Sequence, residues 1–86
     1  MQLRGVTEDD EFGRQAEQII PDARLRDEVL SAAYALLAYY PQAGRLLNHG
    51  VRRLVYDIPP LRMTVVILYT IDGNRVMLHD IFEHSS

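Results

Sequence analysis

The hydrophobic pattern of this chain changes its period at Gly44, and that change limits what the chain can fold into. Between Asp22 and Pro41, apolar residues recur every three or four positions, which predicts an amphipathic helix with Asp22 as its N-cap and Pro41 as its end. After Gly44 the period is two, which is typical of strands. The chain is therefore expected to be α+β, with its helices first and most of its strands last.

An earlier helix is expected at about 8–20, with Thr7 as its N-cap and acids in its first turn that suit the helix dipole. Together the two helices form an αα-hairpin. The expected strands lie at 51–58, 61–71 and 74–82, with a short edge strand at 1–6. We predict a single domain over residues 1–86, in which an N-terminal helical hairpin packs on one face of a small twisted antiparallel β-sheet.

Composition excludes several classes of protein. The 86 residues contain no cysteine, which leaves neither a disulfide nor a thiolate metal site. The longest nearly apolar run, at 32–40, is half the length of about 18 residues that a bilayer-spanning helix needs. The polar, acidic start does not resemble a signal peptide, so a cytoplasmic protein without a membrane partner is expected. Three scattered histidines predict no metal site, and no cofactor is expected.

Charge is distributed unevenly along the chain, whose net charge is −3. Residues 1–28 carry eight acids against four arginines, whereas residues 45–75 carry five arginines against two acids. Lysine is absent, so every cation is a guanidinium, which suits bidentate contacts to carboxylate or phosphate. Strong nonspecific binding to RNA would need a larger basic surface than this chain offers.

The last two strands allow a register to be predicted. A two-residue turn at Asp72-Gly73 places Ile71 opposite Asn74 and continues outward from there. The residues that then face the helices are Met63, Val65, Ile67, Tyr69, Val76, Leu78 and Phe82. The opposite face holds Val66, Leu68, Met77 and Ile81, rimmed by Arg62, Arg75, His79 and Glu83, with Arg62 directly across from Glu83. A bulge near His79-Asp80 is expected, because it would turn Asp80 away from the core.

His79 is the histidine whose surroundings this register defines best. Apolar residues flank it, and Asp80 points to the opposite face, so the adjacent pair does not form a His–Asp dyad. We interpret His79 as a partly buried structural residue, with a partner contact and a catalytic acid or base as alternatives. His84 near the end of the chain and His49 in a loop are weaker catalytic candidates.

Several short motifs follow one another in a recognisable order. Pro41, Gly44 and Arg45 come after the second helix, and Arg53-Leu54 lie in the next strand. Leu68-Tyr69 then precede the acidic, glycine-containing hairpin turn, and an apolar strand follows. Over about residues 10–84, this order and spacing resemble the RelE/ParE superfamily of bacterial type II toxins, and look closest to its ParE-like branch.

The resemblance implies a small α+β toxin that an antitoxin, encoded beside it, wraps and neutralises. ParE-like members poison DNA gyrase, whereas RelE-like members cleave mRNA on the ribosome. This sequence departs from the RelE-like pattern, because Val66 stands where an arginine is common and the chain ends in an acidic segment at 83–86. We therefore predict a ParE-like toxin that binds a protein target, with gyrase as a candidate, and no catalytic residue.

Two alternatives stay open. A RelE-like ribosome-dependent mRNA endoribonuclease would use arginines on the phosphate and a histidine as acid or base. The residues available for those roles are Arg45, Arg53, Arg62, His79 and His84. A decayed, non-toxic member of the same fold is the other alternative.

A partner is expected to bind the mixed face of the terminal hairpin, because the helices of a small domain cover only one face of its sheet. The residues predicted to contact this partner are Arg62, Val66, Leu68, Arg75, Met77, His79 and Ile81.

Overall fold

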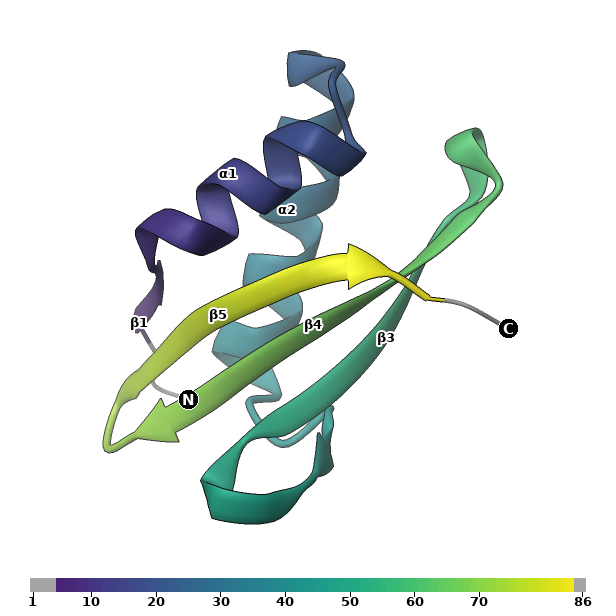
Figure 1. Cartoon of the computed structure of the whole chain (residues 1–86). Helices are drawn as coiled ribbons and strands as arrows, with labels where there is room; N and C mark the ends of the chain where they lie inside the picture. Colours follow the sequence, from purple (N-terminus) through teal and green to yellow (C-terminus); the bar gives the residue numbers. More distant parts are fainter. Residues whose placement is uncertain (1–4, 85–86) are drawn as a thin grey trace.

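Two helices pack against one face of a five-stranded sheet in the computed structural model, which describes residues 5–84 (Figure 1). The elements follow in the order β1 (Gly5–Glu8), α1 (Asp10–Ile19), α2 (Ala23–Tyr39), β2 (Arg45–Leu46), β3 (Arg52–Ile58), β4 (Met63–Asp72) and β5 (Arg75–Glu83). Short 3₁₀ turns, η1 (Asn48–Gly50) and η2 (Pro59–Leu61), flank β3. The predicted α+β fold is confirmed. No helix in the described part of the chain is long and apolar enough to cross a membrane.

The strands lie in the order β1-β5-β4-β3-β2, so the terminal hairpin occupies the middle of the sheet. β1 runs parallel to β5, and the other neighbours are antiparallel. The core lies between the sheet and the helices. Its fully buried side chains include Phe12, Ala33 and Leu37 from the helices and Val65, Ile67, Tyr69, Val76 and Leu78 from the sheet.

The first helix begins two residues later than predicted. Thr7 belongs to β1, because that strand continues alongside β5 up to Glu8, so the predicted Thr7 cap is wrong. Asp9 is the N-cap instead, and its carboxylate accepts a hydrogen bond from the backbone N–H of Phe12. The predicted cap of the second helix is correct, since Asp22 accepts from the N–H of Leu25.

The hairpin turn lies one residue further along than predicted. Asp72 pairs with Arg75, so Gly73 and Asn74 form the turn, and Gly73 at its first central position has a φ of +59°. Glycine at that position is what a type II′ turn requires. The change shifts the pairing by two residues, which preserves the alternation of side chains. The predicted core residues up to Leu78 therefore do face the helices.

Beyond Leu78 the prediction fails, because a bulge at His79 reverses the alternation of β5. Ile81 pairs with Ile67 and is buried in the core, although it was predicted on the opposite face. Phe82 was predicted in the core but is 43% exposed on the opposite face. Glu83 lies across from Val65, so the predicted Arg62–Glu83 pair does not form.

Tyr69 ties the loop after α2 to the middle of the sheet. Its buried hydroxyl accepts a hydrogen bond from Gly44 N (2.8 Å) and donates one to Pro41 O (2.7 Å). Burial raises the pKa of this phenol, which keeps the hydroxyl protonated and able to donate. Gly44 is required here, because a Cβ at this position would lie 2.7 Å from the Tyr69 hydroxyl oxygen. The motif of Pro41, Gly44 and Tyr69 thus has a structural role.

We predict that Gly44→Ala lowers the free energy of unfolding by about 1–3 kcal/mol, because the added methyl group displaces a buried, doubly hydrogen-bonded tyrosine. Urea denaturation measures this change. The matched control is Gly5→Ala, where the nearest atom to the added Cβ is 4.0 Å away. Equal stability of the two variants would show that Tyr69 moves without cost.

Candidate functional site

The bulge in β5 organises the polar contacts at the edge of the sheet. Leu78 pairs with Tyr69 and Asp80 pairs with Leu68, so His79 is the extra residue between them. Gln15 of α1 contacts this irregular segment, because its Oε1 accepts from Ile81 N (2.9 Å) and its Nε2 donates to Asp80 Oδ1 (3.2 Å). The helix thereby satisfies a backbone group of the bulged strand.

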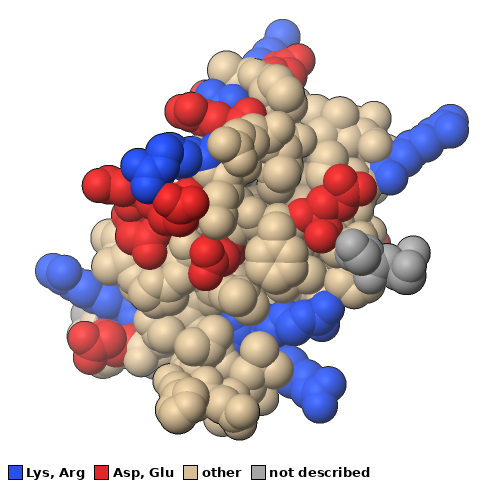
Figure 2. All heavy atoms as spheres, in the orientation of Figure 1, with Lys and Arg blue, Asp and Glu red and all other residues tan. Residues whose placement is uncertain are grey.

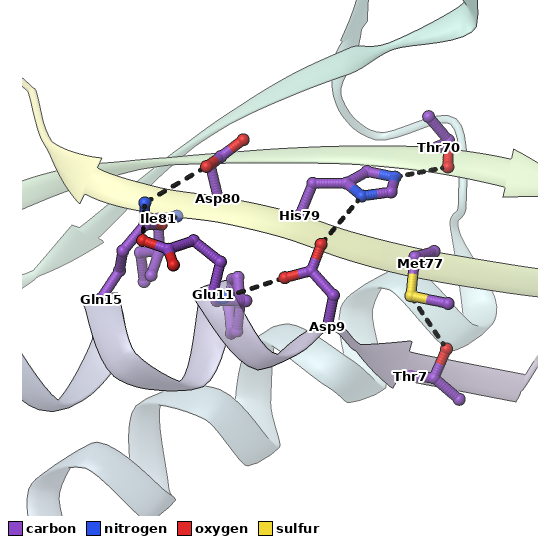
Figure 3. A network of polar contacts seen from close by, with 10 residues as sticks. Thr7, Asp9, Glu11, Gln15, Thr70, Met77, His79, Asp80 and Ile81 are labelled. Carbon is purple, nitrogen blue, oxygen red and sulfur yellow. Dashed lines mark hydrogen bonds and ion pairs between the residues drawn. The ribbon is translucent and has the colours of Figure 1, made fainter.

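His79 lies between a carboxylate and a hydroxyl (Figure 3). Its Nδ1 is 3.2 Å from Asp9 Oδ2, and its Nε2 is 2.9 Å from Thr70 Oγ1. Because an ionised carboxylate only accepts, Nδ1 donates to Asp9, and the Nε2 of a neutral imidazole then accepts from Thr70. The order of carboxylate, imidazole and hydroxyl is that of a Ser-His-Asp triad.

Asp9 has a structural task in this arrangement. One of its oxygens caps α1 through Phe12 N at 2.9 Å, while the other contacts His79. The hydrogen bond from Phe12 N is the main reason that the pKa of Asp9 lies below its ordinary value, and His79 lowers it further. The cap joins the start of α1 to the bulge in β5 and, through Thr70, to β4.

The electrostatics around His79 oppose an anionic substrate. A shallow hollow beside it, the acidic hollow, is lined by Asp9, Glu11, Val51, Leu68, Thr70, His79 and Asp80. Three of these residues are carboxylic acids and none is an arginine, so the hollow repels a phosphodiester. Asp80 and His79 line the same hollow, which corrects the prediction that they point to opposite faces; the bulge is the cause.

An apolar row crosses the face of the sheet that the helices leave open. Val55 of β3, Val66 of β4 and Phe82 of β5 are directly opposite one another in the ladder. Val55 and Phe82 are 46% and 43% exposed, whereas Val66 between them is 1% exposed. Val66 is outside the main core, so its flanking residues cover it on the open face. The prediction that Val66 is available to a partner is therefore wrong.

Two arginines lie beside the apolar row. Arg45 of β2 is directly opposite Arg53 of β3, and Arg53 is directly opposite Leu68 of β4. Arg53 and Val55 are two residues apart on β3, so their side chains share the open face. Figure 2 shows this face with arginine side chains and no acidic side chain over η1 and the start of β3, whereas acidic residues gather over α1.

The other predicted site residues are spread over the sheet. Arg62 lies in the turn before β4 with a φ of +50°, next to Met63 and Thr64. His84 lies near it, since its backbone N–H donates to Thr64 O. Leu68 is half-buried beside the acidic hollow, Met77 accepts a contact from Thr7, and Arg75 is exposed at the hairpin turn. The predicted partner residues thus do not form one surface.

The candidate nuclease residues are not gathered either. Arg45 and Arg53 lie level with Leu68, whereas His84 lies level with Thr64, four residues away along β4. At about 3.3 Å per residue, that separation is roughly 13 Å. His79 is in the acidic hollow, whose lining includes Leu68 but neither Arg45 nor Arg53.

Sequence analysis missed Asp9, Gln15 and Thr70 as partners of the bulge, and Val55 and Phe82 as the exposed apolar pair. Asp9 had a local signal, because an acid three residues before a buried Phe12 is a good N-cap. The contacts of Gln15 with the bulge and of Asp9 with His79 join residues 65 to 70 positions apart, whereas Thr70 contacts His79 across the hairpin, nine positions away. No local pattern encodes these contacts.

Comparison with known proteins identifies the fold. No protein-family model matches the sequence, and no curated protein matches it either. Among solved structures, a chain of the toxin–antitoxin complex RelBE2 from Mycobacterium tuberculosis is similar, with a TM-score of 0.75 and 18% identity over 95% of this chain and 99% of that chain. At this identity the likeness establishes a shared fold, which agrees with the α+β architecture of a helical hairpin on a small sheet that the sequence predicted.

We predict that Asp9→Asn makes the stability of the protein less dependent on pH under acidic conditions. A carboxyl whose pKa is lowered by folding stabilises the native state above its unfolded pKa, and this contribution is lost as the pH falls below 3.8. Asparagine keeps a capping oxygen without the titration. Between about pH 5 and pH 3, thermal melts should therefore show a decline in Tm smaller by a few degrees for the variant. Asp72→Asn, in the exposed hairpin turn, is the control; parallel declines would contradict the assignment.

Proposed function

We propose that this chain is the toxin component of a type II toxin–antitoxin pair, neutralised by a cognate antitoxin, and that it binds a protein target in the manner of ParE-like toxins. The observation that carries the proposal is the fold, which is shared over 95% of the chain with a chain of a toxin–antitoxin complex. A cytoplasmic protein such as DNA gyrase is the candidate target.

The open face of the sheet supports a binding role. Val55 and Phe82 expose apolar surface on either side of Val66, and Arg53, Asp57 and Asp80 provide polar groups around them. An apolar centre with a polar rim is the usual composition of a protein interface. Fully burying an exposed side chain of this kind contributes roughly 1.5–3 kcal/mol, so covering the exposed half of Val55 or Phe82 contributes about half of that before the cost of association.

The same face argues against RNA cleavage. Val66 is buried at the position where the RelE-like pattern has an arginine, so no cation is available there. His79 is held by Asp9 and Thr70 in a hollow lined by carboxylates, which disfavours a developing phosphorane. The candidate acids, bases and cations are spread over the sheet rather than placed around one phosphate.

One observation favours the endoribonuclease as the second candidate. Arg45 and Arg53 are adjacent on the open face, and neither forms an ion pair with any residue that the structure describes. Paired guanidinium groups bind phosphate well. The proposal of a binding protein therefore needs a direct test of RNA cleavage.

We predict that inducing this chain alone arrests bacterial growth, and that co-expressing the protein encoded by the adjacent reading frame restores it. Primer extension on mRNA from translating ribosomes should show no codon-specific cut, because the candidate acids, bases and arginines within residues 5–84 are spread over the sheet. Inhibition of DNA supercoiling by purified gyrase would support the candidate target. Codon-specific cuts that disappear in Arg53→Ala would replace the proposal with the endoribonuclease, and growth without arrest would indicate a decayed toxin.

We predict that Phe82→Glu weakens binding of the neutralising protein at least tenfold without changing the fold, because it places a charge in the apolar row. Isothermal titration calorimetry measures the Kd, and thermal melting checks the fold. The matched control is Leu46→Glu, since Leu46 is 56% exposed on β2 and lies outside the row. Equal loss of affinity in both variants would place the interface elsewhere.

A further inference from the structure

Arg45 and Arg53 form a like-charge pair that the fold itself does not compensate. They are directly opposite in the β2–β3 ladder, where Cβ atoms are about 4.5–5.5 Å apart. Like charges in that position destabilise a sheet. β2 is an edge strand, so no other strand between residues 5 and 84 lies beyond it to bring an acid to Arg45.

The other arginines show that the pair is unusual within this chain. Arg14 forms an ion pair with Glu11, and Arg24 with Glu28. Arg26 and Arg52 donate to backbone carbonyls, with Arg52 bound to Gly44 O at 2.9 Å. The described arginines whose side chains form no hydrogen bond or ion pair are Arg45, Arg53, Arg62 and Arg75. Only Arg45 and Arg53 are paired with each other in the sheet.

The position of the pair relates it to the apolar row. Arg53 is two residues from Val55 on the same strand, which places the two side chains roughly 7 Å apart on one face. A bound segment could therefore set a carboxylate between the guanidinium groups and an apolar side chain on Val55 and Phe82. Bidentate guanidinium contacts would fix the direction of such a segment.

We propose that the Arg45–Arg53 pair is a carboxylate-binding site for an acidic protein segment whose apolar side chain covers Val55 and Phe82. The free protein carries the repulsion between the two arginines, and the bound carboxylate removes it. The inference deepens the proposed function and rests on its assumption that the open face binds a protein.

A carboxylate fits the surroundings better than a nucleic-acid backbone. Asp57 and Asp80 lie on the same face, beyond the apolar row and at the acidic hollow respectively, and the chain has a net charge of −3. A polyanion with a charge at every nucleotide meets these acids, whereas a peptide with one or two acids does not. The proposal therefore concerns a peptide segment.

The repulsion is tested by thermal melting of single variants. Arg53→Gln should raise Tm by about 1–4 °C at low salt, and by less at about 0.5 M salt, because screening already weakens the repulsion there. Arg45→Gln should act similarly, and the double variant should gain little more, since either change removes the pair. Arg62→Gln, an exposed arginine without a neighbour in the ladder, is the control and should leave Tm unchanged. An unchanged or lower Tm for Arg53→Gln would contradict the proposed repulsion.

The ligand chemistry is tested with a phage-displayed library of random 12-residue peptides selected on the intact protein. The enriched peptides should carry Asp or Glu within two or three positions of an aliphatic or aromatic residue. Their synthetic forms should bind Arg45→Gln/Arg53→Gln at least tenfold more weakly and Arg62→Gln equally well. A fluorescein-labelled 12-nucleotide RNA should bind more weakly than these peptides.

Three results would overturn the inference: no enriched peptide, enriched peptides without acids, or RNA that binds more tightly than the peptides through the two arginines. The growth and neutralisation assays remain separate from these measurements. A chain that arrests growth but selects neutral peptides would retain the proposed function and lose the carboxylate site.

Discussion

The extra residue at His79 determines which side chains of β5 reach the core. Without the bulge, strict alternation would bury Phe82 and expose Ile81. With it, Ile81 completes the core and Phe82 joins the exposed apolar row. The irregular backbone is held from outside the strand by Gln15, while His79 is held by Asp9. The N-terminal helix and the last strand are thus interdependent, although they lie at opposite ends of the chain.

Local chemistry explains which parts of this fold could be predicted. The helices, the three long strands and the core face up to Leu78 follow from periodicity, caps and proline positions, all of which act over a few residues. The turn lies one residue later than predicted, but the predicted faces up to Leu78 stay correct, because a two-residue shift in pairing keeps every side chain on its face. The sequence predicts a bulge near His79 because of Asp80, but it does not predict that the bulge buries Ile81 and exposes Phe82. The Asp9–His79 contact spans 70 positions and had no local signal.

The open face has an acidic side and a basic side, which the net charge of −3 does not reveal. The acidic hollow at the α1 edge contains His79 and three carboxylic acids, whereas the Arg45–Arg53 pair lies at the β2 side. A ligand with uniform charge would be attracted at one side and repelled at the other. A protein segment can match both sides and the apolar row between them, because its charges vary from residue to residue.

The bulge also governs how mutations on this face are to be interpreted. Phe82 is exposed only because His79 is an extra residue in β5, and the contacts of Asp9, Gln15 and Thr70 hold that segment. Replacing His79 would therefore move Phe82, and it would lower the affinity for a partner even if that partner does not contact the imidazole. Loss of activity in a His79 variant is then no evidence of acid–base catalysis. Phe82→Glu separates a binding defect from a catalytic one, because it alters the surface and leaves the bulge contacts in place. An equal loss of activity in the His79 variant and in Phe82→Glu would indicate that both act through binding.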